Sequence, residues 1–197
     1  MKLVLATTNL HKIHEIKAML KEYKQFDIYT LRDFPHYTPP EETGLTFEEN
    51  AILKASHASK ALDTLCLADD SGLSIPALNG EPGVKSKRYA GESAKNSENL
   101  KKLVEKLSCL PEKKRFGYFE CSIALANNGE LVKSVKGQCE GKLITIPRGK
   151  NGFGYDSLFI KYDYNKTLAE LETDIKNRIS HRRKALDKIL LALECLI

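Results

Sequence analysis

Hydrophobic and polar positions follow two different periods along the first half of the chain. Three short apolar runs end at polar or turn-forming residues and predict buried strands: residues 2–6, 26–31 and 65–68. Between these runs, apolar side chains recur at helical spacing and predict two helices: residues 11–23 and 46–62. Asn9 is a plausible N-cap for the first helix, and Thr46 with Glu49 forms a capping box for the second.

The second half of the chain adds a hairpin and two further helices. Asn127-Asn128-Gly129-Glu130 separates two strand-like segments, residues 116–125 and 131–138, and Asn-Gly at that place favours a tight hairpin. Helical spacing covers residues 97–107 and 178–193. Because helices alternate with strands before the hairpin, the pattern predicts an α/β fold with a mixed sheet.

Composition excludes several classes of protein. With 42% hydrophobic and 29% charged residues, the 197-residue chain has the proportions of a globular protein rather than a disordered or collagen-like one. No apolar run approaches 18 residues, and the apolar start is too short for a signal peptide, so we expect no membrane segment and a cytoplasmic location. Five scattered cysteines without a C-x-x-C pair argue against a zinc ribbon or redox pair. The net charge of +5 is interspersed, which suits an anionic partner but does not indicate nucleic-acid binding.

Candidate chemistry begins at the turn after the first strand, residues 7–12. Backbone N–H groups at a helix N-terminus bind anions, and Lys12 is placed one turn into the helix. A plain capped helix with a solvated lysine explains the same residues.

Carboxylates gather near two later elements. Asp69-Asp70-Ser71-Gly72 follows the third strand, where one or two carboxylates together with substrate phosphate suffice for Mg²⁺. The segment 41–44 supplies further carboxylates just before the second helix, which carries Lys54. An Asp-rich turn and a solvated acidic loop are the structural alternatives.

Two further segments could contact the purine base of a nucleotide. Phe153 and Tyr155, flanked by glycines and followed by Asp156, offer stacking faces and a carboxylate acceptor. Arginines at 182 and 183, with His181 and Lys176 nearby, could bind phosphate or carbonyl oxygens, although a basic helix face explains them equally well.

Six segments in this order resemble the inosine/xanthosine triphosphate pyrophosphatase family: residues 5–12, 42–51, 68–73, 83–91, 153–156 and 180–182. The resemblance implies an elongated α/β fold with a central mixed sheet and flanking helices. It also implies one domain, residues 1–197, with two lobes around a substrate cleft, and a homodimer. The implied activity is Mg²⁺-dependent hydrolysis of ITP, dITP and XTP to the nucleoside monophosphate and pyrophosphate, which clears deaminated purines from the nucleotide pool.

The resemblance also implies residue roles. Asp70 would be the catalytic base, and the Mg²⁺ ligands would be Glu41, Asp69 and Asp70. The triphosphate would be held by Thr7, Thr8, Asn9, Leu10, His11, Lys12 and Lys54, with Ser71 as a further substrate contact. The purine would be held by Phe153, Gly154, Tyr155, Asp156, Lys176, His181 and Arg182.

Three rival functions remain open at this point. A related Maf-like pyrophosphatase would prefer other nucleotides, and residues 180–182 with Phe153 argue against it. A nucleotide-binding module without catalysis would not need the carboxylate set. A nucleic-acid binder would use the net charge, but the sequence contains no recognised nucleic-acid module.

Overall fold

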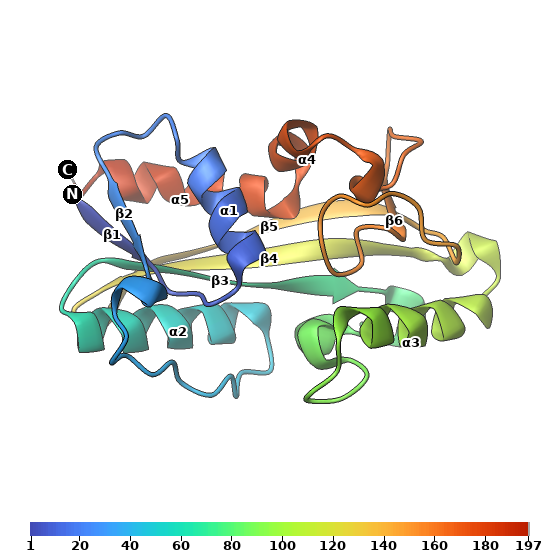
Figure 1. Ribbon diagram of the computed structural model, residues 1–197, viewed down its shortest axis with the longest axis horizontal. Helices are drawn as coiled ribbons and strands as arrows, with labels where there is room; N and C mark the ends of the chain where they lie inside the picture. The colour runs from blue at the N-terminus through green and yellow to red at the C-terminus, as the bar shows by residue number, and fades with distance from the viewer. Residues whose placement is uncertain (197) are drawn as a thin grey trace. The chain divides into compact units, whose positions relative to one another are not determined.

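The computed structural model describes residues 1–196 and shows a mixed six-stranded sheet with the strand order β2-β1-β3-β4-β5-β6 (Figure 1). The strands are β1 (Lys2–Leu5), β2 (Asp27–Thr30), β3 (Cys66–Ser74), β4 (Phe116–Asn127), β5 (Glu130–Leu143) and β6 (Phe159–Lys161). β1 pairs in parallel with β2 and β3, whereas β5 and β6 are antiparallel. The predicted α/β class with a mixed sheet is therefore confirmed.

Helices flank these strands. The α-helices are α1 (Leu10–Met19), α2 (Phe47–Leu62), α3 (Asn96–Ser108), α4 (Thr173–Ile179) and α5 (His181–Glu194). Short 3₁₀ turns cover Leu31–Asp33, Pro76–Leu78, Gly83–Arg88, Glu112–Lys114 and Leu168–Glu170. None of the helices in residues 1–196 is long and apolar enough to cross a membrane.

The chain divides into two compact units, which are described separately below. Unit 1 comprises Met1–Asp70, Cys121–Gly137 and the chain from Arg182 onward. Unit 2 comprises Ser71–Glu120 and Gln138–His181.

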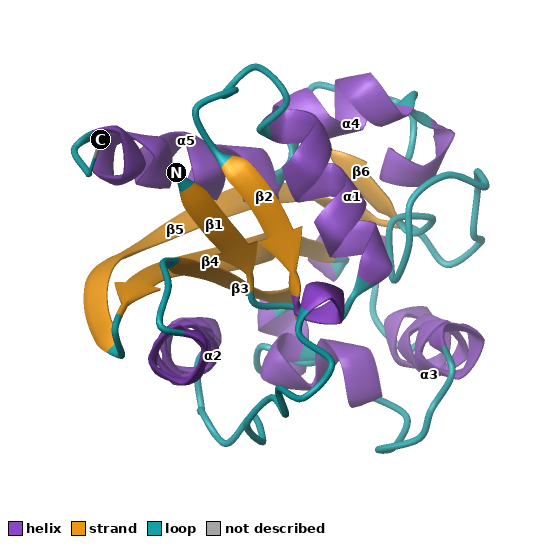
Figure 2. Cartoon of the chain, turned by 60° about the vertical axis from the view of Figure 1, so that its left-hand side comes forward, coloured by secondary structure: helices purple, strands orange, loops and turns teal. Residues whose placement is uncertain are grey.

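In unit 1, side chains alternate between the two faces of the strands, as the pleat requires. One face carries large apolar residues that pack with α1 and α5, among them Leu3, Leu5, Leu67, Ile123 and Leu125. The other face carries smaller residues that pack against the alanines of α2, among them Val4, Ala6, Cys66, Ala68 and Ala124. Helices α1 and α5 thus cover one face of these strands and α2 covers the other (Figure 2).

Unit 2 has a core of its own around the remaining parts of the sheet. Leu103 and Leu107 of α3 are fully buried in the same cluster as Phe119 and Phe159. The two aromatic rings meet edge to face with centroids 4.8 Å apart. This geometry is favourable for aromatic pairs and fixes the strands that carry them.

Several local predictions are confirmed. The Asn9 side chain caps α1 by accepting hydrogen bonds from two backbone N–H groups. Thr46 accepts from Glu49 N–H at the start of α2. Asn128 and Gly129 both have positive φ between β4 and β5, which matches the predicted tight hairpin turn.

Four predicted boundaries are wrong by three residues or more. The first helix ends at Met19 rather than at residue 23, and β5 continues to Leu143 rather than ending at residue 138. The third strand does not end at Ala68, because β3 continues through the acidic residues to Ser74. The closing helix does not begin at residue 178, because Ser180 is extended (φ −73°, ψ 159°) and separates α4 from α5. The short strand β6 carries no alternating pattern long enough to predict, and the sequence analysis missed it.

Candidate active site

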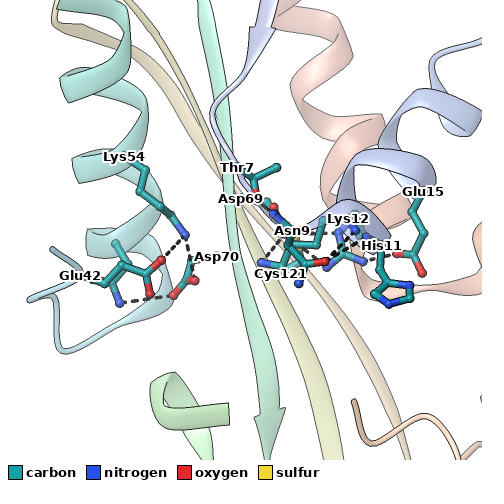
Figure 3. Close-up of polar contacts among 12 residues, drawn as sticks. Thr7, Asn9, His11, Lys12, Glu15, Glu42, Lys54, Asp69, Asp70 and Cys121 are labelled. Carbon is teal, nitrogen blue, oxygen red and sulfur yellow. Dashed lines mark hydrogen bonds and ion pairs between the residues drawn. The ribbon is translucent and has the colours of Figure 1, made fainter. Parts of the chain in front are cut away.

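Two adjacent aspartates of β3 lie on opposite faces of that strand. Asp69 continues the face of Leu67, toward α1 and α5, and Asp70 continues the face of Ala68, toward α2. Figure 3 shows the two carboxylates pointing away from each other. The extension of β3 through the acidic pair is the reason, because consecutive side chains of a strand alternate. The pair therefore forms two separate clusters.

The Asp70 cluster is built on α2. The Lys54 ammonium lies 3.0 Å from Asp70 Oδ1, and the Asn50 amide donates to Asp70 Oδ2 over 3.3 Å. Asn50 and Lys54 are four residues apart, so they lie on one face of the helix. Lys54 also contacts Glu42 Oε1 at 3.1 Å, which places two carboxylates around one cation (Figure 3).

Burial and neighbouring charges shift the pKa values of this cluster in opposite directions. Burial raises the pKa of Asp70 and outweighs the attraction of Lys54 and Lys12, so this carboxyl holds a proton more readily than an exposed aspartate. Burial alone would lower the pKa of Lys54, but Asp70, Asp69 and Glu42 raise it instead. Lys54 consequently stays charged.

The Asp69 cluster is a fully buried charge network. Lys12 Nζ lies 2.9 Å from Asp69 Oδ2, and the Arg182 guanidinium donates to the same oxygen over 3.3 Å and 3.2 Å. Arg182 also donates to Glu15 of α1. Burial would raise the pKa of Asp69, but Lys12 and Arg182 hold it well below its usual range. Burial would lower the pKa of Arg182, and Asp69 and Glu15 raise it. Asp69 and Arg182 are therefore both charged.

The turn before α1 presents a mixture of buried and exposed groups. Asn9 Oδ1 accepts from His11 N–H and Lys12 N–H at 3.0 Å and 3.3 Å, and Thr7 Oγ1 accepts from Asn9 N–H. Thr8, Leu10 and His11 are exposed. The turn carries backbone donors at a helix N-terminus, which is the arrangement that the anion-binding prediction requires.

A second candidate cluster lies entirely within unit 2. Lys176 Nζ contacts Asp156 Oδ2 at 2.6 Å, and the same oxygen accepts from Phe153 N–H at 2.8 Å. The Lys176 ammonium lies 4.8 Å from the centroid of the Phe153 ring. A side chain at Gly152 would come within 2.2 Å of Asp156 Oδ2, and its φ of +75° also favours glycine. The loop therefore wraps closely around the buried carboxylate.

The remaining predicted residues of unit 2 have other surroundings. The Tyr155 hydroxyl donates to the Ser86 carbonyl at 2.9 Å, which ties the loop to residues 83–91. His181 is buried and stacks on Phe119, with ring centroids 5.0 Å apart. Gly154 has a positive φ of 61°. Ser71, the first residue of unit 2, is half-buried in β3.

Three predicted site residues lie elsewhere than expected. Glu41 is exposed, and its neighbour Glu42 is the residue whose carboxylate reaches Lys54. Asp69 lies away from the Asp70 cluster, in the network with Lys12. Arg182 belongs to that same network rather than to the cluster of Lys176, because its guanidinium is bound by Asp69 and Glu15.

Sequence reasoning missed Asn50 and Glu15, and within the acidic segment 41–44 it singled out Glu41 rather than Glu42. The signal for Asn50 was its position one helical turn before Lys54, on the face that meets β3. Glu15 is one turn after its neighbour Lys12, and only the fold brings Arg182 to it.

The donor set fits a Mg²⁺ ion that is completed by a ligand. Glu42 and Asp70 both contact the Lys54 ammonium, so the two carboxylates lie around one positive group. Among residues 1–196, no three His, Cys, Asp or Glu side chains converge as an all-protein metal cage. Mg²⁺ commonly binds through one or two carboxylates plus substrate phosphates and water, so two carboxylates are enough.

The structure is therefore an α/β fold whose mixed sheet carries buried clusters of acidic and basic side chains. The chain belongs to the Ham1 family, whose model matches residues 3–192. A dITP/XTP pyrophosphatase from Protochlamydia amoebophila (strain UWE25) is 51% identical over 195 residues, which cover 98% of each chain.

Two solved structures share the fold at substantial sequence identity. A HAM1 protein from Coxiella burnetii superimposes with a TM-score of 0.89 at 41% identity, over 98% of each chain. The Ham1 protein of Staphylococcus aureus gives a TM-score of 0.87 at 39% identity, over 100% of each chain.

Proposed function

We propose that this protein is a nucleoside triphosphate pyrophosphatase that acts on the deaminated purine nucleotides dITP, XTP and ITP. The observation that carries the proposal is the buried Asp70, whose carboxylate is held by Lys54 and Asn50 beside Glu42. The name dITP/XTP pyrophosphatase, borne by a relative that is 51% identical, supports the substrate class.

Asp70 is the general base of the proposed reaction. Water attacks the α-phosphorus, the bond between that phosphorus and the α,β-bridging oxygen breaks, and the products are the nucleoside monophosphate and pyrophosphate. Asp70 accepts the proton of the attacking water. Its raised pKa suits this role, because a carboxylate with a higher proton affinity is a stronger base near neutral pH.

Charge neutralisation is the second element of the mechanism. Lys54 keeps its positive charge within the cluster and can contact a phosphate oxygen, while the turn of residues 7–12 offers backbone donors. Glu42 and Asp70 would hold the Mg²⁺ ion, in place of the predicted set of Glu41, Asp69 and Asp70. When bound, Mg²⁺ supplies positive charge that offsets the charge developing on the triphosphate.

The unit 2 cluster accounts for a preference among bases. The Lys176 ammonium is only a donor, so it can pair with the 6-oxo group of hypoxanthine or xanthine but not with the 6-amino group of adenine. An ammonium N–H that faces the 6-amino group of adenine would meet another donor, and this mismatch disfavours ATP. Phe153 offers a ring for stacking, and Asp156 fixes Lys176 beside it. Guanine also has a 6-oxo group, so discrimination against GTP depends on the 2-position.

Product analysis tests the proposal. The purified protein is incubated with Mg²⁺ and, separately, with dITP, XTP, ITP, GTP and ATP, and the products are resolved by ion-exchange chromatography. We expect monophosphate and pyrophosphate from the first three nucleotides and little from ATP. The Asp70→Asn variant should bind dITP but not hydrolyse it. Release of single phosphates would refute the proposal in favour of a different phosphohydrolase reaction. No turnover by the wild type would refute it in favour of a nucleotide-binding module.

The homodimer and the cytoplasmic location stay predictions. Light scattering of the purified protein at several concentrations measures the oligomeric state. A mass of twice 22.1 kDa is expected, and a monomer at all concentrations would contradict it.

A further inference from the structure

We propose that Asn50 is a positioning residue that ties the loop carrying Glu42 to the carboxylate of Asp70. The inference rests on the proposed function, which assigns roles to both carboxylates but none to Asn50. It is carried by the contacts of one buried amide.

The Asn50 side chain is fully buried and uses both ends of its amide. Oδ1 accepts from Gly44 N–H over 2.8 Å, and Nδ2 donates to Gly44 O over 3.4 Å and to Asp70 Oδ2 over 3.3 Å. The acceptor at Asp70 and the donor at Gly44 define which end of the amide is nitrogen. A flipped amide would place two acceptors against each other at Asp70.

Gly44 lies so close to α2 that position 44 has no room for a side chain. A Cβ at this position would lie 2.6 Å from Asn50 Oδ1 and 2.9 Å from Asn50 N. The loop of residues 41–46 therefore packs, through the backbone of Gly44, directly against the side-chain amide of Asn50. Glu42, two residues earlier in that loop, reaches Lys54 from there.

Asp70 receives one donor on each oxygen, and both donors come from α2. Lys54 approaches Oδ1 and Asn50 approaches Oδ2, so the plane of the carboxylate is fixed from two points on a rigid helix. The Lys54 ammonium is a point charge that contacts both Asp70 and Glu42, whereas the planar Asn50 amide is also held by Gly44. Asn50 thus sets the orientation of the base and the position of the Glu42 loop together.

A neighbouring residue provides a matched control. Glu49 Oε2 accepts from Leu45 N–H at 2.7 Å, so it anchors the same loop without contacting Asp70. Loss of Glu49 loosens the loop only, whereas loss of Asn50 also frees one oxygen of Asp70.

The experiment compares Asn50→Ala, Asn50→Asp and Glu49→Ala with the wild type. Hydrogen exchange of residues 41–46, followed by mass spectrometry, reports on the loop, and dITP hydrolysis gives kcat and KM. We expect Asn50→Ala to lower kcat by about ten-fold or more while KM changes by less than about three-fold, since misplacing a catalytic group reduces the rate of the chemical step. Asn50→Asp keeps an acceptor for Gly44 N–H but no donor for Asp70, so it should also lose kcat with slower loop exchange than Asn50→Ala.

Glu49→Ala should keep kcat within about two-fold of the wild type despite faster loop exchange. The inference is overturned if Asn50→Ala or Asn50→Asp retains wild-type kcat, or if Glu49→Ala reproduces the loss. A wild type without activity would refute the proposed function instead. In that case the side-chain NH₂ resonances of Asn50 still test the contact, because they should shift in Asp70→Ala and an unchanged position would overturn it.

Discussion

Replacing Asp69 by asparagine should destabilise the fold far more than the same change at Asp70. Both variants remove one negative charge from neighbouring positions of β3. Asp69 is fully buried and contacts both Lys12 and Arg182, and Glu15 is a second carboxylate that contacts Arg182. The variant removes the carboxylate that both cations contact, whereas Lys54 keeps its contact with Glu42 when Asp70 is replaced.

The magnitude follows from the contacts. Breaking a buried ion pair by removing one partner costs about 3–5 kcal/mol of unfolding free energy. For a chain of this size, each kcal/mol corresponds to about 2–4 °C in Tm, so Asp69→Asn should lower Tm by about 6–20 °C. Burial outweighs the attraction of Lys54 at Asp70, so Asp70→Asn should change Tm by less than about 5 °C.

Calorimetry of the two variants and the wild type measures this difference, and dITP hydrolysis is assayed alongside. Asp70→Asn should keep its stability and lose turnover. Asp69→Asn should lose stability. Equal Tm values for Asp69→Asn and the wild type would refute the reasoning, because they would show that the buried network contributes nothing to folding.

Three further outcomes follow from the same contacts. Because the folded-state pKa of Asp69 is depressed below 3.8, its contribution is present above that pH and lost as the pH falls through the lower, folded-state value. The Tm difference between wild type and Asp69→Asn should therefore be constant from about pH 7 to about pH 5 and shrink below about pH 4. Lys176→Ala should reduce the ratio of kcat/KM for ITP over ATP by about ten-fold or more, and an unchanged ratio would remove Lys176 from base recognition. Arg182→Lys should lower the free energy of unfolding by about 1–3 kcal/mol in denaturant titrations, because lysine cannot bridge Asp69 and Glu15 as the guanidinium does. Unchanged stability together with an altered preference among nucleotide bases would instead assign Arg182 to base recognition.

Local signals in the sequence account for the caps, the hairpin and the alternation of helices with strands. Asn9 and Thr46 cap their helices through neighbours two or three residues away, so a short stretch of sequence is enough to predict their roles. The end of β3 was missed because two aspartates after an apolar run normally indicate a turn. They remain in the strand because lysines and an arginine from helices on both faces neutralise them.

Long-range contacts decide the parts of the site that sequence could not predict. Arg182 is 113 residues from Asp69, and no local pattern shows that the two meet. Glu41 and Glu42 are adjacent and chemically identical, and the packing of Gly44 against Asn50 selects Glu42 for the contact with Lys54. The family resemblance implied a set of site residues. Because side chains alternate between the two faces of β3, its adjacent aspartates, Asp69 and Asp70, belong to different clusters.

Hydrolysis of dITP in H₂¹⁸O tests the central claim most directly. If Asp70 directs water to the α-phosphorus, mass spectrometry should find one ¹⁸O atom in each dIMP formed and none in the pyrophosphate, and the Asp70→Asn variant should release neither product. Label in pyrophosphate or in free phosphate would place the attack at another phosphorus and contradict the assignment of the site.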